Sequence, residues 1–270
     1  MRSRSGATVD FVPLSEQSTA IVTGAGAEAG IGFATARRMA AAGMHVVMVA
    51  TSERIHDRAA ELVSAGWSAE GAICDLRDSA AVDSLVGALT GRCCIDVLVN
   101  NAGMTSRAAG ADADRLLDEL TVDEWDDTMR RNLTTAFSMC RAVVPGMRGR
   151  RHGRIVNVAS TTGPVSAFAG ASGYAAAKAG MVGMTRALAI EVASSGITVN
   201  AVAPGWIDTP SVTEWERRAG AASPTGRSGT ADEVAAVVAF LASRDASYVN
   251  GAVIVVDGAN HVVEDVGGAR

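Results

Sequence analysis

Residues 19–32 read TAIVTGAGAEAGIG, an apolar run that leads through a glycine-rich turn into an amphipathic stretch. The apolar run predicts a buried strand, and the amphipathic stretch predicts a helix. Between them, Gly24, Gly26 and Gly30 allow the backbone to turn tightly and to approach a ligand closely. The helix that begins near Ile31 offers free N–H groups and the positive end of its dipole to a pyrophosphate. Such a turn is often only structural, but its place after a first strand favours dinucleotide binding.

Outward from this segment, apolar runs and amphipathic stretches alternate along the chain. Apolar, mostly Val-rich runs predict buried strands at 19–23, 45–50, 69–74, 95–100, 154–159, 198–203 and 252–256. Amphipathic stretches predict helices at 32–42, 54–65, 79–89, 122–144, 173–194 and 231–243. The alternation predicts a doubly wound α/β fold, in which a seven-stranded parallel sheet carries helices on both faces and a cleft at the carboxyl ends of its strands.

Length and composition suit one domain of this kind. The chain has 270 residues, of which 48% are hydrophobic, and its 29 glycines and few aromatic residues are spread without a break in composition. We expect a flexible polar leader at 1–17 and a single catalytic domain at 18–270. The leader lacks the apolar core of a signal peptide, and no run approaches the roughly 20 apolar residues of a membrane span. We therefore expect a cytoplasmic protein without a membrane partner.

Charge and metal-binding residue types exclude two further classes of function. Lys and Arg total 24 against 29 Asp and Glu, a net charge of −5, so nucleic acid is not an expected partner. The short basic run around Arg148, Arg150, Arg151 and Arg154 is interpreted as a solvated turn. Four cysteines and four histidines stand without ligand-like spacing, so we expect reduced structural thiols and no metal site.

Further motifs follow the glycine-rich turn in a fixed order. They are Asp75-Leu76 after the third strand, Asn100-Asn101-Ala102-Gly103 after the fourth, Asn132 in a helix, Ser160 after the fifth strand, Tyr174 with Lys178, Pro204-Gly205 after the sixth strand, and Val256-Asp257-Gly258 at the last. The ordered set resembles the classical short-chain dehydrogenase/reductase family over roughly residues 18–258. Within it, the sequence at 50–53 resembles that of 3-oxoacyl-thioester reductases. The resemblance implies a Rossmann fold and a bound nicotinamide dinucleotide.

One departure from the family lies in the first turn. Five residues separate Gly24 from Gly30, whereas the family usually has three at this place. We expect the two additional residues to bulge from the turn and to alter its phosphate contacts.

The chemistry expected of Tyr174 rests on charge. Hydride transfer to a ketone leaves negative charge on oxygen, which a phenol can meet with a proton and a hydrogen bond. An ordinary tyrosine has a pKa of about 10. Lys178 lies one helical turn further on the same face, where its ammonium is expected to favour the phenolate. The alternative is an ordinary packed aromatic residue, although the chain has only two tyrosines.

The resemblance assigns further roles. Lys178 would hydrogen-bond the nicotinamide ribose, Ser160 would donate to the substrate oxygen, and Asn132 would hold a water molecule. The alternatives are a cap or turn residue for Ser160 and a structural amide in the helix interior for Asn132. Expected cofactor contacts are Gly24, Gly26, Gly30, Ile31, Asp75, Leu76, Asn101, Ala102, Gly103, Tyr174, Lys178, Pro204, Gly205, Ile207 and Thr209. A substrate lid is expected near 206–226, where Trp206 and Trp215 either line an apolar pocket or serve packing.

The end of the second strand bears on the choice of nicotinamide. Relatives that prefer NAD usually carry an acidic residue there, whereas this chain has Ala50. Thr51, Ser52 and Arg54 follow it and offer donors to a 2′-phosphate, so NADP(H) is favoured. Nearby Glu53 leaves NAD(H) as the alternative.

Together these features predict an NAD(P)-dependent ketoreductase or alcohol dehydrogenase that acts on a small carbonyl or alcohol substrate. A related enzyme of sugars, polyols or secondary metabolites is one alternative. A dinucleotide-binding sensor or scaffold without turnover is another. The helices at 122–144 and 173–194 are expected to pack between subunits, which would give a homodimer or homotetramer.

Overall fold

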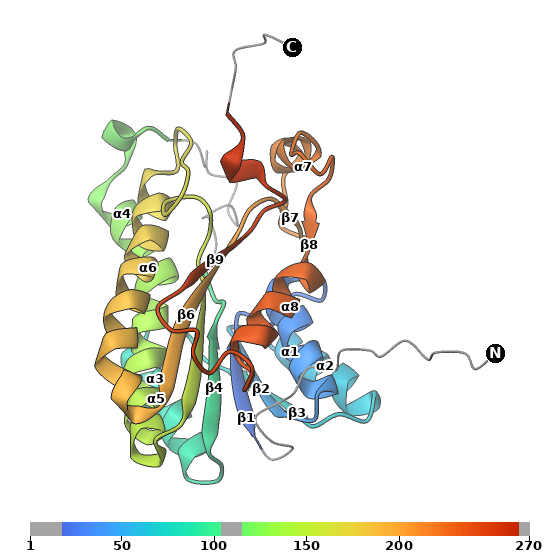
Figure 1. Cartoon of the computed structure of the whole chain (residues 1–270), viewed down its shortest axis with the longest axis vertical. Coiled ribbons are helices and arrows are strands. Elements are labelled where there is room, and N and C mark those ends of the chain that lie inside the picture. Colours follow the sequence, from blue (N-terminus) through green and yellow to red (C-terminus); the bar gives the residue numbers. More distant parts are fainter. Residues whose placement is uncertain (1–17, 104–114, 265–270) are drawn as a thin grey trace, which may run out of the picture.

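The computed structural model describes residues 18–103 and 115–264, so the expected leader at 1–17 lies outside the described residues. Seven parallel strands form one sheet in the order β3-β2-β1-β4-β5-β6-β9 (Figure 1). The strands are β1 (Thr19–Thr23), β2 (His45–Ala50), β3 (Ala69–Ile73), β4 (Ile95–Asn100), β5 (Gly153–Val158), β6 (Ile197–Pro204) and β9 (Val253–Val256). The strand order reverses between β1 and β4, which is where this class of fold opens a cleft.

Helices cover both faces of the sheet, as Figure 1 shows. One face carries α1 (Ile31–Ala41), α2 (Arg54–Ser64) and α8 (Ala231–Leu241), and the other carries α3 (Ser79–Thr90), α5 (Thr135–Arg150) and α6 (Ser172–Val192). The alternation of side chains along β1 divides the core accordingly: Ala20 and Val22 pack with the first group, and Ile21 packs with the second. The predicted doubly wound fold is confirmed.

The single helix expected at 122–144 is wrong. The chain forms α4 (Val122–Met129), then one π-helical turn over Arg130–Thr134, and only then α5. A π turn inserts one residue into the helical repeat. The apolar pattern on either side of the turn remains helical, so hydrophobic periodicity alone did not reveal it. The turn carries Asn132, which is fully buried and donates from Nδ2 to the carbonyl oxygen of Thr128 at 3.1 Å.

A small second sheet, which the sequence did not predict, encloses the segment 209–228. Strand β7 (Ile207–Asp208) pairs in parallel with β8 (Gly229–Thr230), and the Gly229 N–H donates to the carbonyl oxygen of Trp206 at 2.9 Å. Between the two strands lies α7 (Glu214–Ala221), whose N-terminus is closed by a capping box of Thr213 and Glu216. The segment expected as a lid is therefore anchored at both of its ends. Short 3-10 turns complete the fold at Leu117–Glu119, Ala193–Ser195 and Asn260–Val262.

The basic run is not uniformly solvated, in contrast to its interpretation from the sequence. Arg154 is only 5% exposed, because it lies within β5. Its guanidinium donates to the carbonyl oxygens of Gly153 at 2.9 Å, Ser243 at 3.2 Å and Gly196 at 3.4 Å. Arg154 thus joins the start of β5 to the loops after α8 and α6.

Candidate active site

Two connected cavities open at the carboxyl ends of the strands. The first, the glycine-turn cavity, has a volume of about 740 Å³ and is bounded by the first turn, the end of β2 and the segment after β3. The second, the tyrosine cavity, has a volume of about 390 Å³ and is bounded by Ser160, Tyr174 and the segment after β6. Both cavities are lined by Ile31, Asn101, Gly103, Thr209 and Ser211, which makes them one continuous site.

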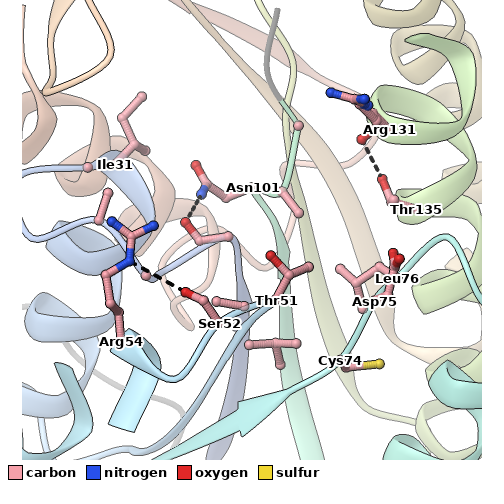
Figure 2. Close-up of a pocket in the computed structure, with 18 of the residues that line it drawn as sticks. Ile31, Thr51, Ser52, Arg54, Cys74, Asp75, Leu76, Asn101, Arg131 and Thr135 are labelled. Carbon is pink, nitrogen blue, oxygen red and sulfur yellow. Dashed lines mark hydrogen bonds between the residues drawn. The ribbon is translucent and has the colours of Figure 1, made fainter. Parts of the chain in front are cut away.

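The structure brings almost all the expected site residues to these two cavities, the first of which is shown in Figure 2. The glycine-turn cavity is lined by Gly24, Gly26, Gly30, Ile31, Thr51, Ser52, Arg54, Asp75, Leu76, Asn101, Ala102, Gly103 and Thr209. The tyrosine cavity is lined by Ser160, Tyr174, Lys178, Pro204, Gly205 and Ile207, together with the shared residues. Asn132 lies behind the wall, where a Cβ atom added to Gly103 would stand 2.8 Å from its Oδ1 atom.

Hydrogen bonds between β1 and the segment after β4 fix the glycine-rich turn. The Thr23 hydroxyl accepts from the backbone N–H groups of Asn101 and Ala102, both at 3.0 Å. The Asn101 side-chain amide in turn donates to the carbonyl oxygens of Thr23 at 3.0 Å and Gly24 at 3.1 Å. These bonds satisfy polar groups at the strand ends and hold the two loops together.

The backbone of the turn fits a pyrophosphate. Gly24 has a φ of +68°, and a Cβ atom there would stand 2.8 Å from the Ala102 Cα atom. A Cβ atom on Gly26 would stand 3.2 Å from the Ala50 methyl group. Gly30 is the N-cap of α1 and offers no side-chain cap, so the first-turn N–H groups of the helix are available to an anion at the cavity. A side chain at Gly24 would meet the backbone of Ala102, and one at Gly26 would press on the Ala50 methyl group, so glycines allow the turn to follow this tight path.

The two additional residues of the turn form an exposed tip, as the sequence predicted. Ala27, Glu28 and Ala29 are exposed, and Gly30 closes the tip by donating from its N–H to the Ala27 carbonyl oxygen at 3.0 Å. Glu28 forms an ion pair with Arg58 of α2 at 3.3 Å. The Arg58 guanidinium also lies over the Phe33 ring, 5.6 Å from its centroid. The tip is therefore tied to both α1 and α2.

Arginine side chains line the glycine-turn cavity, among them Arg54 after β2 and Arg77 after β3. Figure 2 shows Arg54 beside Ser52, with Arg54 Nε donating to the Ser52 hydroxyl at 3.5 Å. Arg77, which sequence reasoning missed, also lines the cavity and forms a two-pronged contact with Asp75. Hydrogen bonds from Arg77 lower the pKa of Asp75, so this carboxylate stays ionised. The only sequence signal for Arg77 is its position two residues after the Asp of the motif.

Tyr174 and Ser160 meet in the tyrosine cavity. Burial raises the pKa of Tyr174, a hydrogen bond with the Ser160 side chain partly offsets this effect, and the Glu216 carboxylate raises the pKa further. Ser160 also accepts from the Thr162 N–H at 3.1 Å. Ser160 and Tyr174 thus line the same cavity.

Lys178 does not lower the pKa of Tyr174 as the sequence argument expected. Its Nζ atom lies 5.6 Å from the centroid of the Tyr174 ring and donates to the Val158 carbonyl oxygen at 2.9 Å. Lys178 is only 3% exposed, and burial lowers its pKa to about 8. Desolvation is the largest influence on the pKa of both groups.

Three aromatic residues and one carboxylate complete the tyrosine cavity. Phe168, Trp206 and Trp215 line it together with Glu216. The sequence hypothesis that the tryptophans line a pocket is confirmed for both residues. Phe168 and Glu216 carry no motif, because the fold brings Phe168 from the loop between β5 and α6 and Glu216 from α7.

No group of three or more His, Cys, Asp or Glu residues within 18–103 and 115–264 has the arrangement of a metal site. None of the helices in these same ranges combines the length and the apolar character that crossing a membrane requires.

The fold and the paired cavities define a dinucleotide-binding enzyme of the doubly wound class. A family profile described as "Enoyl-(Acyl carrier protein) reductase" matches residues 24–261, and the chain belongs to the short-chain dehydrogenase/reductase family. The expected resemblance is confirmed, and with it NAD(P)-dependent oxidoreduction at a carbonyl or alcohol as the class of reaction.

Individual relatives agree with this assignment. The chain is 40% identical over 253 residues to the 3-oxoacyl-[acyl-carrier-protein] reductase FabG of Escherichia coli (strain K12), covering 92% of this chain and 99% of the relative. Levodione reductase has a solved structure with a TM-score of 0.85 and 34% identity, covering 93% of this chain and 99% of its own. A structure titled "putative NAD(P) dependent gluconate 5-dehydrogenase" from Beutenbergia cavernae, with bound NADP, has a TM-score of 0.84 and 35% identity, covering 94% and 100%.

Proposed function

We propose that this protein is an NADPH-dependent ketoreductase in which Tyr174 is the proton donor. The observation that carries the proposal is that Ser160, Tyr174 and Lys178 line one cavity, which is continuous with the glycine-turn cavity. The names of relatives that reduce ketones, FabG and levodione reductase, support the direction of the reaction.

The dinucleotide would lie along the two cavities. Gly24, Gly26 and the N-terminus of α1 would hold the pyrophosphate, and Asp75 with Leu76 would line the adenine end. The segment from Pro204 to Thr209 would border the nicotinamide, which supplies the hydride when it is bound.

The protein groups at the tyrosine cavity manage the proton and the developing charge. Because its pKa is raised, Tyr174 is protonated at neutral pH and can donate to the oxygen of a ketone that gains negative charge. Ser160 would donate a hydrogen bond to the same oxygen. The Lys178 ammonium would stabilise the phenolate left behind, and Asn132, held by Thr128, would orient a water molecule behind it.

The preference for NADPH over NADH is part of the proposal. Ala50 presents no carboxylate that would repel a 2′-phosphate, and Arg54 and Ser52 lie beside it in the same cavity wall. The NADP bound in the gluconate 5-dehydrogenase structure supports the same preference.

Three features of the biological setting stay predictions. The segment 206–226 is proposed to cover the substrate, because it brings Trp206, Trp215 and Glu216 to the wall of the tyrosine cavity. We also place the protein in the cytoplasm and infer a homodimer or homotetramer. Cell fractionation and the mass in solution would test these two statements.

Turnover is the test that separates an enzyme from a silent dinucleotide sensor. NADPH oxidation is followed by its absorbance with a panel of cyclic, aryl and aliphatic ketones. We expect NADPH to be consumed when a ketone is present, at a higher rate than NADH is consumed. Binding of NADPH without turnover of any ketone would instead favour the sensor.

A further inference from the structure

The tyrosine cavity has a wall composition that points to one class of substrate. We propose that it selects uncharged ketones that carry a ring next to or containing the carbonyl group, and that it disfavours ketones bearing a carboxylate. Phe168, Trp206 and Trp215 would recognise the ring, and Glu216 would reject the anion. This inference rests on the proposed ketoreductase function and names the substrate of that same site.

The three aromatic residues form one mutually packed wall. Phe168 lies in the loop between β5 and α6, Trp206 follows β6, and Trp215 lies on α7. The ring centroids of Trp206 and Trp215 are 5.2 Å apart with the planes at 88°, and Phe168 lies 5.3 Å from Trp215 and 6.2 Å from Trp206. These separations are within the favourable range for aromatic pairs. The wall is therefore formed before a substrate binds, by contacts among three separate segments of the fold.

A preassembled aromatic wall favours rigid rings over flexible chains. Trp215 remains 43% exposed, so ring surface is available for a substrate to cover. A ring presents flat apolar area to such a wall and has few rotatable bonds to immobilise, whereas an alkyl chain loses more freedom when it binds. The volume of about 390 Å³ is at the small end for ligand pockets, which suits one or two rings better than a long acyl chain.

Glu216 brings negative charge to the same cavity. Its carboxylate accepts from the Thr213 N–H at 2.7 Å and hydroxyl at 2.8 Å, which holds it at the start of α7. Its charge also reaches the reacting end of the cavity, since it raises the pKa of Tyr174. A substrate carboxylate in this space would face a fixed like charge, and such a contact is an effective means of rejecting a competing ligand.

The test compares matched pairs of ketones with the wild-type protein and NADPH. Acetophenone is measured against 2-octanone for the ring, and ethyl acetoacetate against acetoacetate for the charge. We expect kcat/KM to be at least about tenfold higher for the ring ketone and for the ester, respectively. Equal or higher kcat/KM for 2-octanone would overturn the ring assignment, and equal or higher kcat/KM for acetoacetate would overturn the charge assignment.

Two variants assign these preferences to residues. Trp215→Leu should reduce the preference for acetophenone to about threefold or less, whereas Tyr248→Leu, a fully exposed position outside both cavities, should leave it unchanged. Glu216→Gln removes the charge but keeps a residue that can complete the capping box. It should bring kcat/KM for acetoacetate to within about threefold of that for the ester. Unchanged ratios in both variants would contradict the assignment.

This inference and the proposed function fail in different ways. If linear or anionic ketones are reduced as well as ring ketones, the ketoreductase proposal stands and the substrate class is wrong. If NADPH binds, as seen by its fluorescence, but none of the four ketones nor any ketone of the wider panel is reduced, the proposed function itself is wrong.

Discussion

At the scale of single residues, the site combines a protonated phenol with a lysine of unusually low basicity. Burial raises the pKa of Tyr174 and lowers that of Lys178 to about 8, so at neutral pH the phenol is protonated and Lys178 is still mostly an ammonium. In the proposed mechanism the phenol donates the proton. The ammonium of Lys178 would be available only below its pKa, which would give the proposed reaction a pH limit.

This limit leads to a prediction for the pH profile of ketone reduction. Because Lys178 loses its charge as pH rises through about 8, kcat/KM should fall above that pH while Tyr174, with its raised pKa, stays protonated. Lys178→Arg keeps the charge to much higher pH and should move the fall upward, although at lower overall activity. Initial rates between pH 6 and 10 would check this. A rate of reduction that increases steadily across this range would contradict the role of Lys178.

We attribute the proposed preference for NADPH to Arg54. Arg54→Ala should weaken NADPH binding by about tenfold to a hundredfold and NADH binding by about twofold or less, because only the former has a phosphate to pair with the guanidinium. Fluorescence titration with each nucleotide measures both values. Equal loss for the two nucleotides would assign Arg54 to the fold of the turn instead.

At the scale of elements, two irregularities shape the site. The π turn after α4 buries Asn132 behind Gly103, and the β7–β8 pair anchors the segment that carries Trp215 and Glu216. Both depart from regular helix and strand patterns close to the cavities. This is where functional sites commonly depart from local sequence rules.

Buried Arg154 allows a test of stability at this scale. Arg154→Met should lower the free energy of unfolding by about 2–4 kcal/mol, because three backbone carbonyl groups lose a charged donor. Arg148→Met, at an exposed position in the same basic run, should change it by less than about 0.5 kcal/mol. Urea unfolding of both variants measures the difference. Equal free energies of unfolding for the Arg154→Met and Arg148→Met variants would contradict the stabilising role of Arg154.

At the scale of the whole molecule, apolar side chains remain exposed on the helices expected between subunits. Phe137 on α5 is 52% exposed and Ile190 on α6 is 81% exposed. Ile190→Glu should therefore shift the molecular mass in solution toward the monomer, whereas Val63→Glu on α2 should not. Light scattering after size exclusion measures the mass. A wild-type monomer would contradict the predicted assembly.

The sequence predicted the sheet and the cofactor-facing loops because these depend on local patterns. Val-rich runs revealed the strands, and ordered motifs led to Tyr174, Ser160 and the glycine-rich turn. It did not reveal Phe168 or Glu216, since only tertiary contacts bring them to the cavity. It also gave the wrong sign for the pKa of Tyr174, because spacing reports the nearby charge of Lys178 but not the burial, which is the largest influence on this pKa.

The proposed mechanism depends on proton donation from the Tyr174 hydroxyl to the ketone oxygen. The variant Tyr174→Phe removes only that hydroxyl oxygen and leaves the ring in place. The measurement is NADPH consumption with a ketone that the wild type reduces, alongside NADPH affinity by fluorescence. We expect turnover to fall by about a hundredfold or more while the affinity for NADPH changes by less than about threefold. Turnover within about threefold of the wild type, at unchanged affinity, would contradict it.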